Sequence, residues 1–213
     1  MIVVESSLWQ DKLAIAELVR MERWWRDQGD WGRLGDSYVE DSRVRTTWFA
    51  GTGREFAEAS REMAERRSRH SKHLITPTEI RVNGDRALVE SLGEIHNRDE
   101  LDGVSIDTVQ YCRFFSRVIR TSAGWRLASF EAIYQKDTMA PVFPGEHIPV
   151  DRLEWDRLRP AYRVWAYMLT RKGYDVPQDD RIVAQDRPDL VAAFYKDAER
   201  WLESGAAAAL GRG

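Results

Sequence analysis

The feature that most restricts the fold of this chain is a change in its hydrophobic period near residue 73. Before residue 67, apolar residues such as Leu8 and Ile15 recur at helical spacing. From His73 to Tyr134, apolar and polar residues alternate instead, which is the pattern of half-buried strands. Helices followed by strands predict an α+β fold, in which the helices pack on one face of a sheet.

The alternating region predicts four antiparallel strands joined as a meander, with one earlier strand added to them. Asn83 and Gly84 form a dipeptide that strongly favours a tight hairpin turn. Pro77 lacks a backbone N–H, so it predicts a bulge or an edge position in the first strand of the meander. The expected strands span residues 43–49, 73–82, 86–96, 104–120 and 125–134.

Three helices are expected before the meander. The first should end near Gln28, because Gly29 suits the left-handed conformation that follows many helices. The second should span residues 31–39, and the third should span residues 54–67. Together with the strands, they complete one α+β unit.

The character of the chain changes after residue 138. Prolines and a glycine between Met139 and Val150 predict an extended linker, and two further helices are expected over residues 151–172 and 188–203. We therefore divide the chain into a domain of residues 1–138 and a C-terminal helical extension of residues 139–213. The extension is expected to pack on this domain or on a dimer partner.

Composition and charge argue against several classes of protein. The net charge is only −3, so binding to nucleic acid or to an anionic membrane is not expected. The chain has no apolar run of the roughly 20 residues that would span a bilayer. The N-terminus lacks the regions of a signal peptide, and the lone Cys112 indicates a reducing compartment, so we expect a cytoplasmic protein.

Several catalytic motifs are absent from the sequence. It contains no HExxH or HxH metal motif, no glycine-rich nucleotide loop and no Gly-x-Ser-x-Gly turn. Hydride transfer, ATP use and serine hydrolysis are therefore disfavoured. We expect no metal and no cofactor.

Three segments of the chain resemble a known family when they are taken together in their order. They are residues 15–31 (IAELVRMERWWRDQGDW), 73–87 (HLITPTEIRVNGDRA) and 124–137 (GWRLASFEAIYQKD). They resemble the SnoaL-like branch of the nuclear transport factor 2-like superfamily, over residues 8 to about 137. The resemblance implies a cone-shaped α+β barrel, in which a strongly curved and mostly antiparallel sheet packs on three N-terminal helices and leaves a deep pocket.

The resemblance also implies catalytic roles for Asp27, His73 and His96. In scytalone dehydratase-like members, an Asp at the position of Asp27 pairs with a His at the position of His73, which gives a base that works near neutral pH. His96 fits a second His that protonates the leaving oxygen, if the alignment shifts by two residues. His70 is a further candidate. The alternative is a solvated acid at a helix end and histidines on the surface.

Five side chains are expected to bind the substrate. Members of this kind carry a Tyr on the first strand, but that position falls near Thr46 here, and Trp48 should share its face. Scytalone itself is therefore a poor substrate guess. Tyr111 or Tyr134 could supply the missing phenol from another strand, and Trp25 could line the pocket with Trp48. Each of these residues could instead be ordinary core packing.

The resemblance favours a cofactor-independent lyase or isomerase that acts on a hydrophobic cyclic molecule, with dehydratase-type proton transfer by an Asp–His dyad. Three alternatives stay open. One is a polyketide cyclase that performs an aldol closure, and another is a non-catalytic small subunit like those of ring-hydroxylating dioxygenases. The third is a binding module without turnover. Because the family assembles through its open sheet face, a homodimer or homotrimer is expected.

Overall fold

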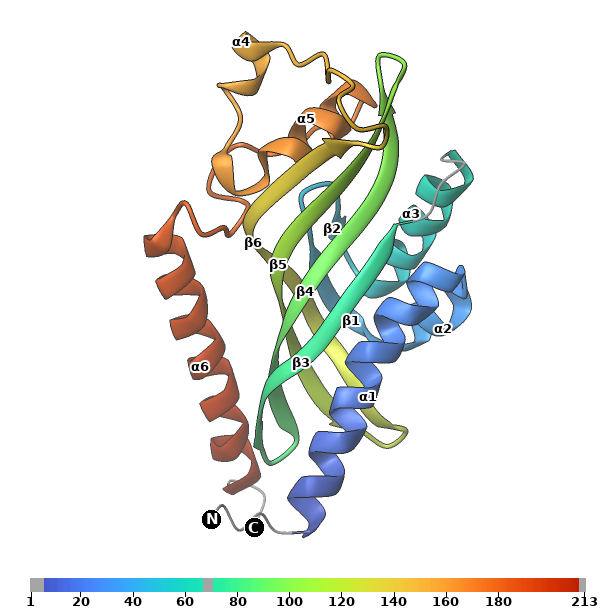
Figure 1. Ribbon diagram of the computed structural model, residues 1–213. Helices are drawn as coiled ribbons and strands as arrows, with labels where there is room; N and C mark the ends of the chain where they lie inside the picture. Colours follow the sequence, from blue (N-terminus) through green and yellow to red (C-terminus); the bar gives the residue numbers. More distant parts are fainter. Residues whose placement is uncertain (1–5, 67–70, 211–213) are drawn as a thin grey trace.

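One strongly curved sheet of six strands forms the centre of the molecule (Figure 1). The computed structural model describes residues 6–66 and 71–210, with side chains over 7–66 and 71–204. The strands lie in the order β2-β1-β6-β5-β4-β3. Their bounds are β1 Tyr38–Arg45, β2 Ala50–Gly51, β3 Lys72–Asn83, β4 Arg86–Leu101, β5 Val104–Thr121 and β6 Gly124–Pro141.

The four long strands β3 to β6 form the expected antiparallel meander. The earlier strand β1 joins it by pairing in parallel with β6, and the short β2 pairs with β1 at the sheet edge. The early strand was expected over residues 43–49, and this was wrong. The chain leaves the strand after Arg45 and turns, with the Thr46 N–H donating to the Phe49 carbonyl at 2.8 Å.

Three N-terminal helices cover one face of the sheet, which we call the inner face. They are α1 (Ser6–Gln28), α2 (Trp31–Asp36) and α3 (Gly53–Arg66). Gly29 has a φ of +76°, so α1 ends where the sequence predicts. The shared core contains fully or almost fully buried side chains from the helices and the sheet: Ile15, Val19, Leu34, Phe56, Phe114 and Phe130. The α+β fold class is confirmed.

The helix expected over residues 151–172 is broken into three pieces. They are α4 (Arg152–Trp155), a 3-10 turn (Pro160–Tyr162) and α5 (Arg163–Arg171). Pro160 explains the break, because a proline disfavours helical backbone in the residue before it. Arg159 is accordingly extended, with φ −64° and ψ 130°.

The last helix, α6 (Pro188–Leu210), packs on the opposite, outer face of the sheet (Figure 1). Its Val191, Phe194 and Leu202 form a buried cluster with outward side chains of three strands. The Phe115 and Phe194 rings meet edge to face with centroids 5.0 Å apart. The extension therefore packs on the barrel. None of the helices in the described parts of the chain has the length and apolar character that a membrane crossing requires.

Candidate active site

A buried contact joins the last turn of α1 to the start of β3. The Asp27 Oδ1 lies 2.6 Å from the His73 Nδ1, and the His73 backbone N–H donates to the Asp27 Oδ2 at 2.7 Å. Both side chains are almost completely buried, with 5% of Asp27 and 3% of His73 exposed. The carboxylate thus holds the backbone and the ring of the same residue, which fixes the direction of the imidazole.

The protonation states of this pair follow from its surroundings. Burial opposes the ionised form of Asp27, but the hydrogen bonds and charge of His73 outweigh it and lower the pKa of Asp27. Burial lowers the pKa of His73 to about 4, although Asp27 acts in the opposite direction, and Arg26 lowers it further. His73 is therefore neutral at pH 7. Because a carboxylate only accepts, the ring N–H is on Nδ1, and Nε2 carries a free lone pair.

His73 lines a small cavity whose walls include several aromatic side chains. Thr46, Trp48 and Tyr134, which were expected to bind substrate, line the same cavity. Its volume is about 20 Å³, which is room for about one water molecule. The deep pocket expected from the family resemblance is therefore filled by side chains in this structure.

Phe114 forms the floor of the cavity beside His73, at 6.2 Å between ring centroids. The Phe114 ring can lie over the neighbouring strand β4 because Gly93 has no side chain at that point. A Cβ on Gly93 would stand 2.3 Å from the Phe114 ring. Phe114 in turn packs on Phe130, at 5.4 Å. The glycine in β4 thus sets the position of one wall.

A buried charged cluster lies behind the cavity and was not foreseen from the sequence. Arg23 is paired with Glu22, and the Tyr38 hydroxyl donates to the Glu22 Oε1 at 2.7 Å. The Arg23 guanidinium also lies 4.2 Å from the Phe130 ring centroid. All three polar side chains are buried. The sequence contains a signal for the burial of Glu22, because Glu22 lies seven positions after Ile15 and therefore on the apolar face of α1.

Two arginines bring positive charge to the cavity. Arg23 and Arg26 both line it with His73. The Arg26 Nε donates to the Ser60 Oγ at 3.3 Å, and its guanidinium lies 5.7 Å from the Trp48 ring centroid. Such a site favours an anion, or a reaction in which negative charge develops.

The C-terminal extension closes the cavity from one side. Trp165 of α5 lines it, and the Trp165 indole N–H donates to the Thr47 Oγ1 at 3.0 Å. The Tyr134 hydroxyl lies 3.2 Å from the same Thr47 oxygen. Burial raises the pKa of Tyr134, so its phenol stays neutral at neutral pH. A side chain outside the family-like region therefore completes the site.

Asp137 on β6 anchors the helix that carries Trp165. The Trp165 backbone N–H donates to the Asp137 Oδ2 at 2.8 Å, although the cap residue of α5, Tyr162, offers no side-chain bond. Burial raises the pKa of Asp137 to about 6, and the hydrogen bonds from α5 only partly offset this effect. The carboxylate thus joins the barrel to the extension.

Replacing Asp137 by Asn should stabilise the protein at pH 7.5 more than at pH 5. An acid whose folded pKa rises from 3.8 to about 6 costs about 3 kcal/mol of stability above pH 6, and this cost disappears as the pH falls towards 3.8. Asn keeps the acceptor and removes the charge. Urea unfolding at both pH values measures the difference. Asp137→Ala is the control, because it leaves the helix N–H without an acceptor and should destabilise at either pH. An equal gain from Asn at both pH values contradicts this assignment.

His96 does not reach the cavity, which corrects the expectation that it does. The partner of His73 across the β3–β4 pair is Ile95, and Ile95 lines the cavity. Side chains alternate along a strand, so His96 points to the outer face. There it is 41% exposed and lies 2.8 Å from the Glu94 carboxylate. The two-residue shift assumed in aligning His96 keeps its side chain on the same face of the strand, and that face is the outer one.

Tyr111 and Trp25 also lie outside the cavity wall. Tyr111 is paired with Glu94 across β4–β5, so it shares the outer face, where Lys136 lies 4.8 Å from its ring centroid. Trp25 packs against the main core and is not among the cavity's lining residues. Of the expected substrate-binding residues, the structure gathers Thr46, Trp48 and Tyr134. His70 lies outside the described residues.

Within the described residues, no group of three or more His, Cys, Asp or Glu side chains is arranged to hold a metal ion. The candidate site consists of a neutral imidazole, its carboxylate partner, two arginines and a neutral phenol around a small aromatic cavity. This set is suited to moving a proton and stabilising a developing anion.

Comparison with known proteins extends over both parts of the chain. Pea pathogenicity protein 2 of Fusarium vanettenii is 27% identical over 206 residues, which are 93% of this chain and 88% of that protein. A PEP2-like protein of the same fungus is 28% identical over 201 residues, which are 91% of this chain and 86% of that protein. These similarities take in most of the C-terminal extension.

Two solved structures share the fold. A putative scytalone dehydratase from Novosphingobium aromaticivorans superposes with a TM-score of 0.51 at 20% identity, over 68% of this chain and 95% of that one. A type 2 hexachlorocyclohexane dehydrochlorinase (LinA) gives 0.53 at 15% identity, over 66% and 95%. The family model described as the SnoaL-like domain matches residues 8–131. Because this match takes in more than half of the chain, the chain belongs to the SnoaL-like domain family.

Proposed function

We propose that this protein is a cofactor-independent lyase or isomerase that acts on a hydrophobic cyclic small molecule. The observation that carries the proposal is the 2.6 Å contact between Asp27 and the His73 Nδ1 at the wall of the aromatic cavity. It leaves the His73 Nε2 as an oriented, unprotonated base at pH 7.

In the proposed reaction, the His73 Nε2 takes a proton from the carbon next to a substrate carbonyl. The electron pair of the broken C–H bond forms the enolate, whose oxygen carries the new negative charge. Asp27 stabilises the imidazolium that results. In an isomerisation the imidazolium returns the proton to another carbon. In a dehydration it protonates the departing hydroxyl group, which leaves as water. His96, on the outer face, takes no part.

The arginines of the cavity support this chemistry. Arg23 and Arg26 favour the enolate, and their charges disfavour protonation of His73 when no anion is present. As negative charge forms on the substrate, it offsets them and makes the imidazolium easier to form. The base is therefore weak in the empty site and strengthens as the reaction proceeds.

A substrate with a ring needs more room than the 20 Å³ of the cavity. We propose that the side chains of Trp48 and Trp165 move outward when it binds. The names of two proteins with this fold, a putative scytalone dehydratase and a hexachlorocyclohexane dehydrochlorinase, are those of eliminations on ring-shaped molecules. This is the reaction class proposed here.

The proposal is tested with a panel of cyclic ketones and β-hydroxy ketones in D₂O at pH 7.5. Mass spectrometry follows the uptake of deuterium and the loss of water. We expect at least one compound to react with the wild type and with His96→Gln, and not with His73→Gln. The His96 variant is the matched control, because it makes the same change on the outer face. Equal rates for His73→Gln and the wild type contradict the proposal.

The remaining alternatives have their own outcomes. Ring closure of an open-chain diketone, added to the panel for this purpose, identifies a polyketide cyclase that uses the same base. If panel compounds raise the melting temperature but none reacts, the protein is a binding module without turnover. A constant partner in a pull-down favours a non-catalytic subunit.

We also propose a homodimer or homotrimer. Leu74 and Leu92 are 59% and 56% exposed on strands of the outer face, and burial in an assembly would cover them. Light scattering measures the mass in solution.

A further inference from the structure

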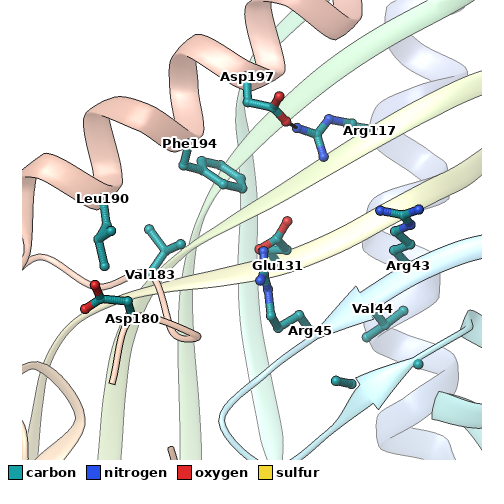
Figure 2. Close-up of a pocket in the computed structure, with 12 residues that line it drawn as sticks. Arg43, Val44, Arg45, Arg117, Glu131, Asp180, Val183, Leu190, Phe194 and Asp197 are labelled. Carbon is teal, nitrogen blue, oxygen red and sulfur yellow. Dashed lines mark hydrogen bonds and ion pairs between the residues drawn. The ribbon is translucent and has the colours of Figure 1, made fainter. Parts of the chain in front are cut away.

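A second, larger recess lies on the outer face of the sheet, away from His73. It consists of two hollows of about 480 and 650 Å³ between α6 and the strands β1 and β6. Both hollows are lined by Arg43, Arg117 and Asp197, so they form one continuous recess, which we call the outer groove. Figure 2 shows the residues of the smaller hollow. These volumes are typical of sites that bind small molecules.

The floor of the outer groove is a row of three residues on adjacent strands. Arg43 of β1 is opposite Ser129 of β6, and Ser129 is opposite Arg117 of β5. Neighbouring strands lie about 4.8 Å apart, so the two arginine backbones are separated by roughly 10 Å, with a serine between them. The sheet has a bulge beside Ser129, where Ala128 has no partner in the pairing with β5. Two cations thus flank a small hydroxyl side chain.

Most charges of the outer groove are already paired. Arg117 is bonded to Asp197 of α6 at 2.8 Å, and Arg45 to Glu131 at 2.6 Å. Figure 2 shows both contacts, with Arg43 standing apart from the acidic side chains drawn. Arg43 has no hydrogen bond or ion pair with any residue that the structure describes. Arg43 is therefore a cation at the floor of the groove that forms no ion pair within the described residues.

Ser129 and Arg117 add hydrogen-bond donors to the floor of the outer groove. Ser129 lines the groove, and its hydroxyl has no hydrogen-bond partner among the side chains described, residues 7–66 and 71–204. The Arg117 Nε is buried and also lacks an acceptor there. Buried polar groups are nearly always hydrogen-bonded, so the buried Arg117 Nε without an acceptor, close to Arg43, indicates a missing acceptor.

One end of the outer groove has three apolar side chains beside the carboxylate of Asp180, which pairs with Arg187. Val183, Leu190 and Phe194 line it there, next to the charged floor. A ligand that fits both parts has an anionic head and an apolar body.

We propose that the outer groove binds a small molecule with an oxyanion head, a carboxylate or a phosphate. The head lies over Ser129 between Arg43 and Arg117, where planar guanidinium groups hold such anions by paired hydrogen bonds. The apolar body lies against Phe194 and Leu190. This site is separate from the His73 cavity, since its residues point to the opposite face of the sheet.

Asp41 allows a second test of the proposal, in which the expected effect on binding has the opposite sign. It is exposed, lines the larger hollow and lies two residues before Arg43. Its carboxylate repels an anion in the groove. Removal of this charge should therefore strengthen binding, while removal of the Arg43 charge should weaken it.

The test is a titration of the full chain with inorganic phosphate and, separately, with benzoate, at constant ionic strength. Isothermal calorimetry and NMR chemical shifts report binding. We expect saturable binding that Arg43→Gln weakens at least tenfold, Ser129→Ala weakens by a smaller factor and Asp41→Asn tightens. Tighter binding of benzoate than of phosphate identifies a carboxylate with an apolar body, and the reverse order identifies a phosphate head.

Arg54→Gln is the matched control. Arg54 is an exposed arginine on α3 that pairs with Asp36, and its loss changes the net charge by the same amount. If this variant weakens binding as much as Arg43→Gln does, the effect is general charge screening and the site is refuted. An absence of saturable binding of both anions by the wild type refutes it as well. Neither result depends on catalysis at His73.

Discussion

Replacing Asp27 by Asn should lower kcat/KM by about 10²–10⁴, with the fold unchanged. The carboxylate accepts from the Nδ1–H of His73 and thereby keeps the lone pair on Nε2, which faces the cavity. An amide at position 27 can donate to Nδ1 instead, which moves the ring proton to Nε2. The base then has no lone pair to offer the substrate. It also loses the negative charge that stabilises the imidazolium.

This result is measured on whichever compound the ketone panel identifies. Asp30→Asn is the matched control, because it makes the same change three residues later. Asp30 caps α2 by accepting from the Arg33 N–H at 3.2 Å, and Asn is an equally good cap. The control should keep full activity. A fully active Asp27→Asn would remove the dyad from the mechanism.

Replacing Glu22 by Ala should lower the free energy of unfolding by about 3–5 kcal/mol. Glu22 is 2% exposed, and it is the acceptor of both the Arg23 guanidinium and the Tyr38 hydroxyl. Without it, a buried cation and a buried phenol lose their partner far from water. Urea unfolding monitored by circular dichroism measures the loss.

The double variant Glu22→Leu with Arg23→Met separates charge from packing. It replaces the buried pair by apolar side chains of similar size, which is often neutral for stability. We expect it to recover most of the loss caused by Glu22→Ala. If the double variant is less stable than Glu22→Ala, packing of the arginine stem accounts for the effect rather than its unpaired charge.

The sequence predicts the architecture well, because the change of period and the turn residues are local signals. Gly29 ends α1, and Asn83–Gly84 turns between β3 and β4, at the expected positions. Asp27 and His73 are brought into contact as the family resemblance implies. The end of α1 and the turn depend on short stretches of chain, whereas the contact between Asp27 and His73 was predicted from the family resemblance.

What the sequence does not predict depends on register and on distant packing. Successive side chains of a strand point to opposite faces of the sheet, so an alignment that is uncertain by one residue does not predict which face a side chain occupies. For this reason His96 was placed on the wrong face. Trp165 was not foreseen in the site, because nothing local connects it to Thr47, 118 residues away. The small volume of the cavity also depends on side chains from distant segments, including Trp165, and was not predicted.

The pairing of β1 with β6 has a consequence for how this protein folds. It joins residues 43–45 to residues 129–131, whereas the meander joins strands that follow each other. Contacts between distant segments form late, because a long loop must close before they stabilise anything. Synthesis proceeds from the N-terminus, so a growing chain cannot cover its Thr47 and Tyr134 hydroxyl groups until Trp165 has left the ribosome. This wall of the cavity is therefore completed only after the whole sheet and α5 have been synthesised.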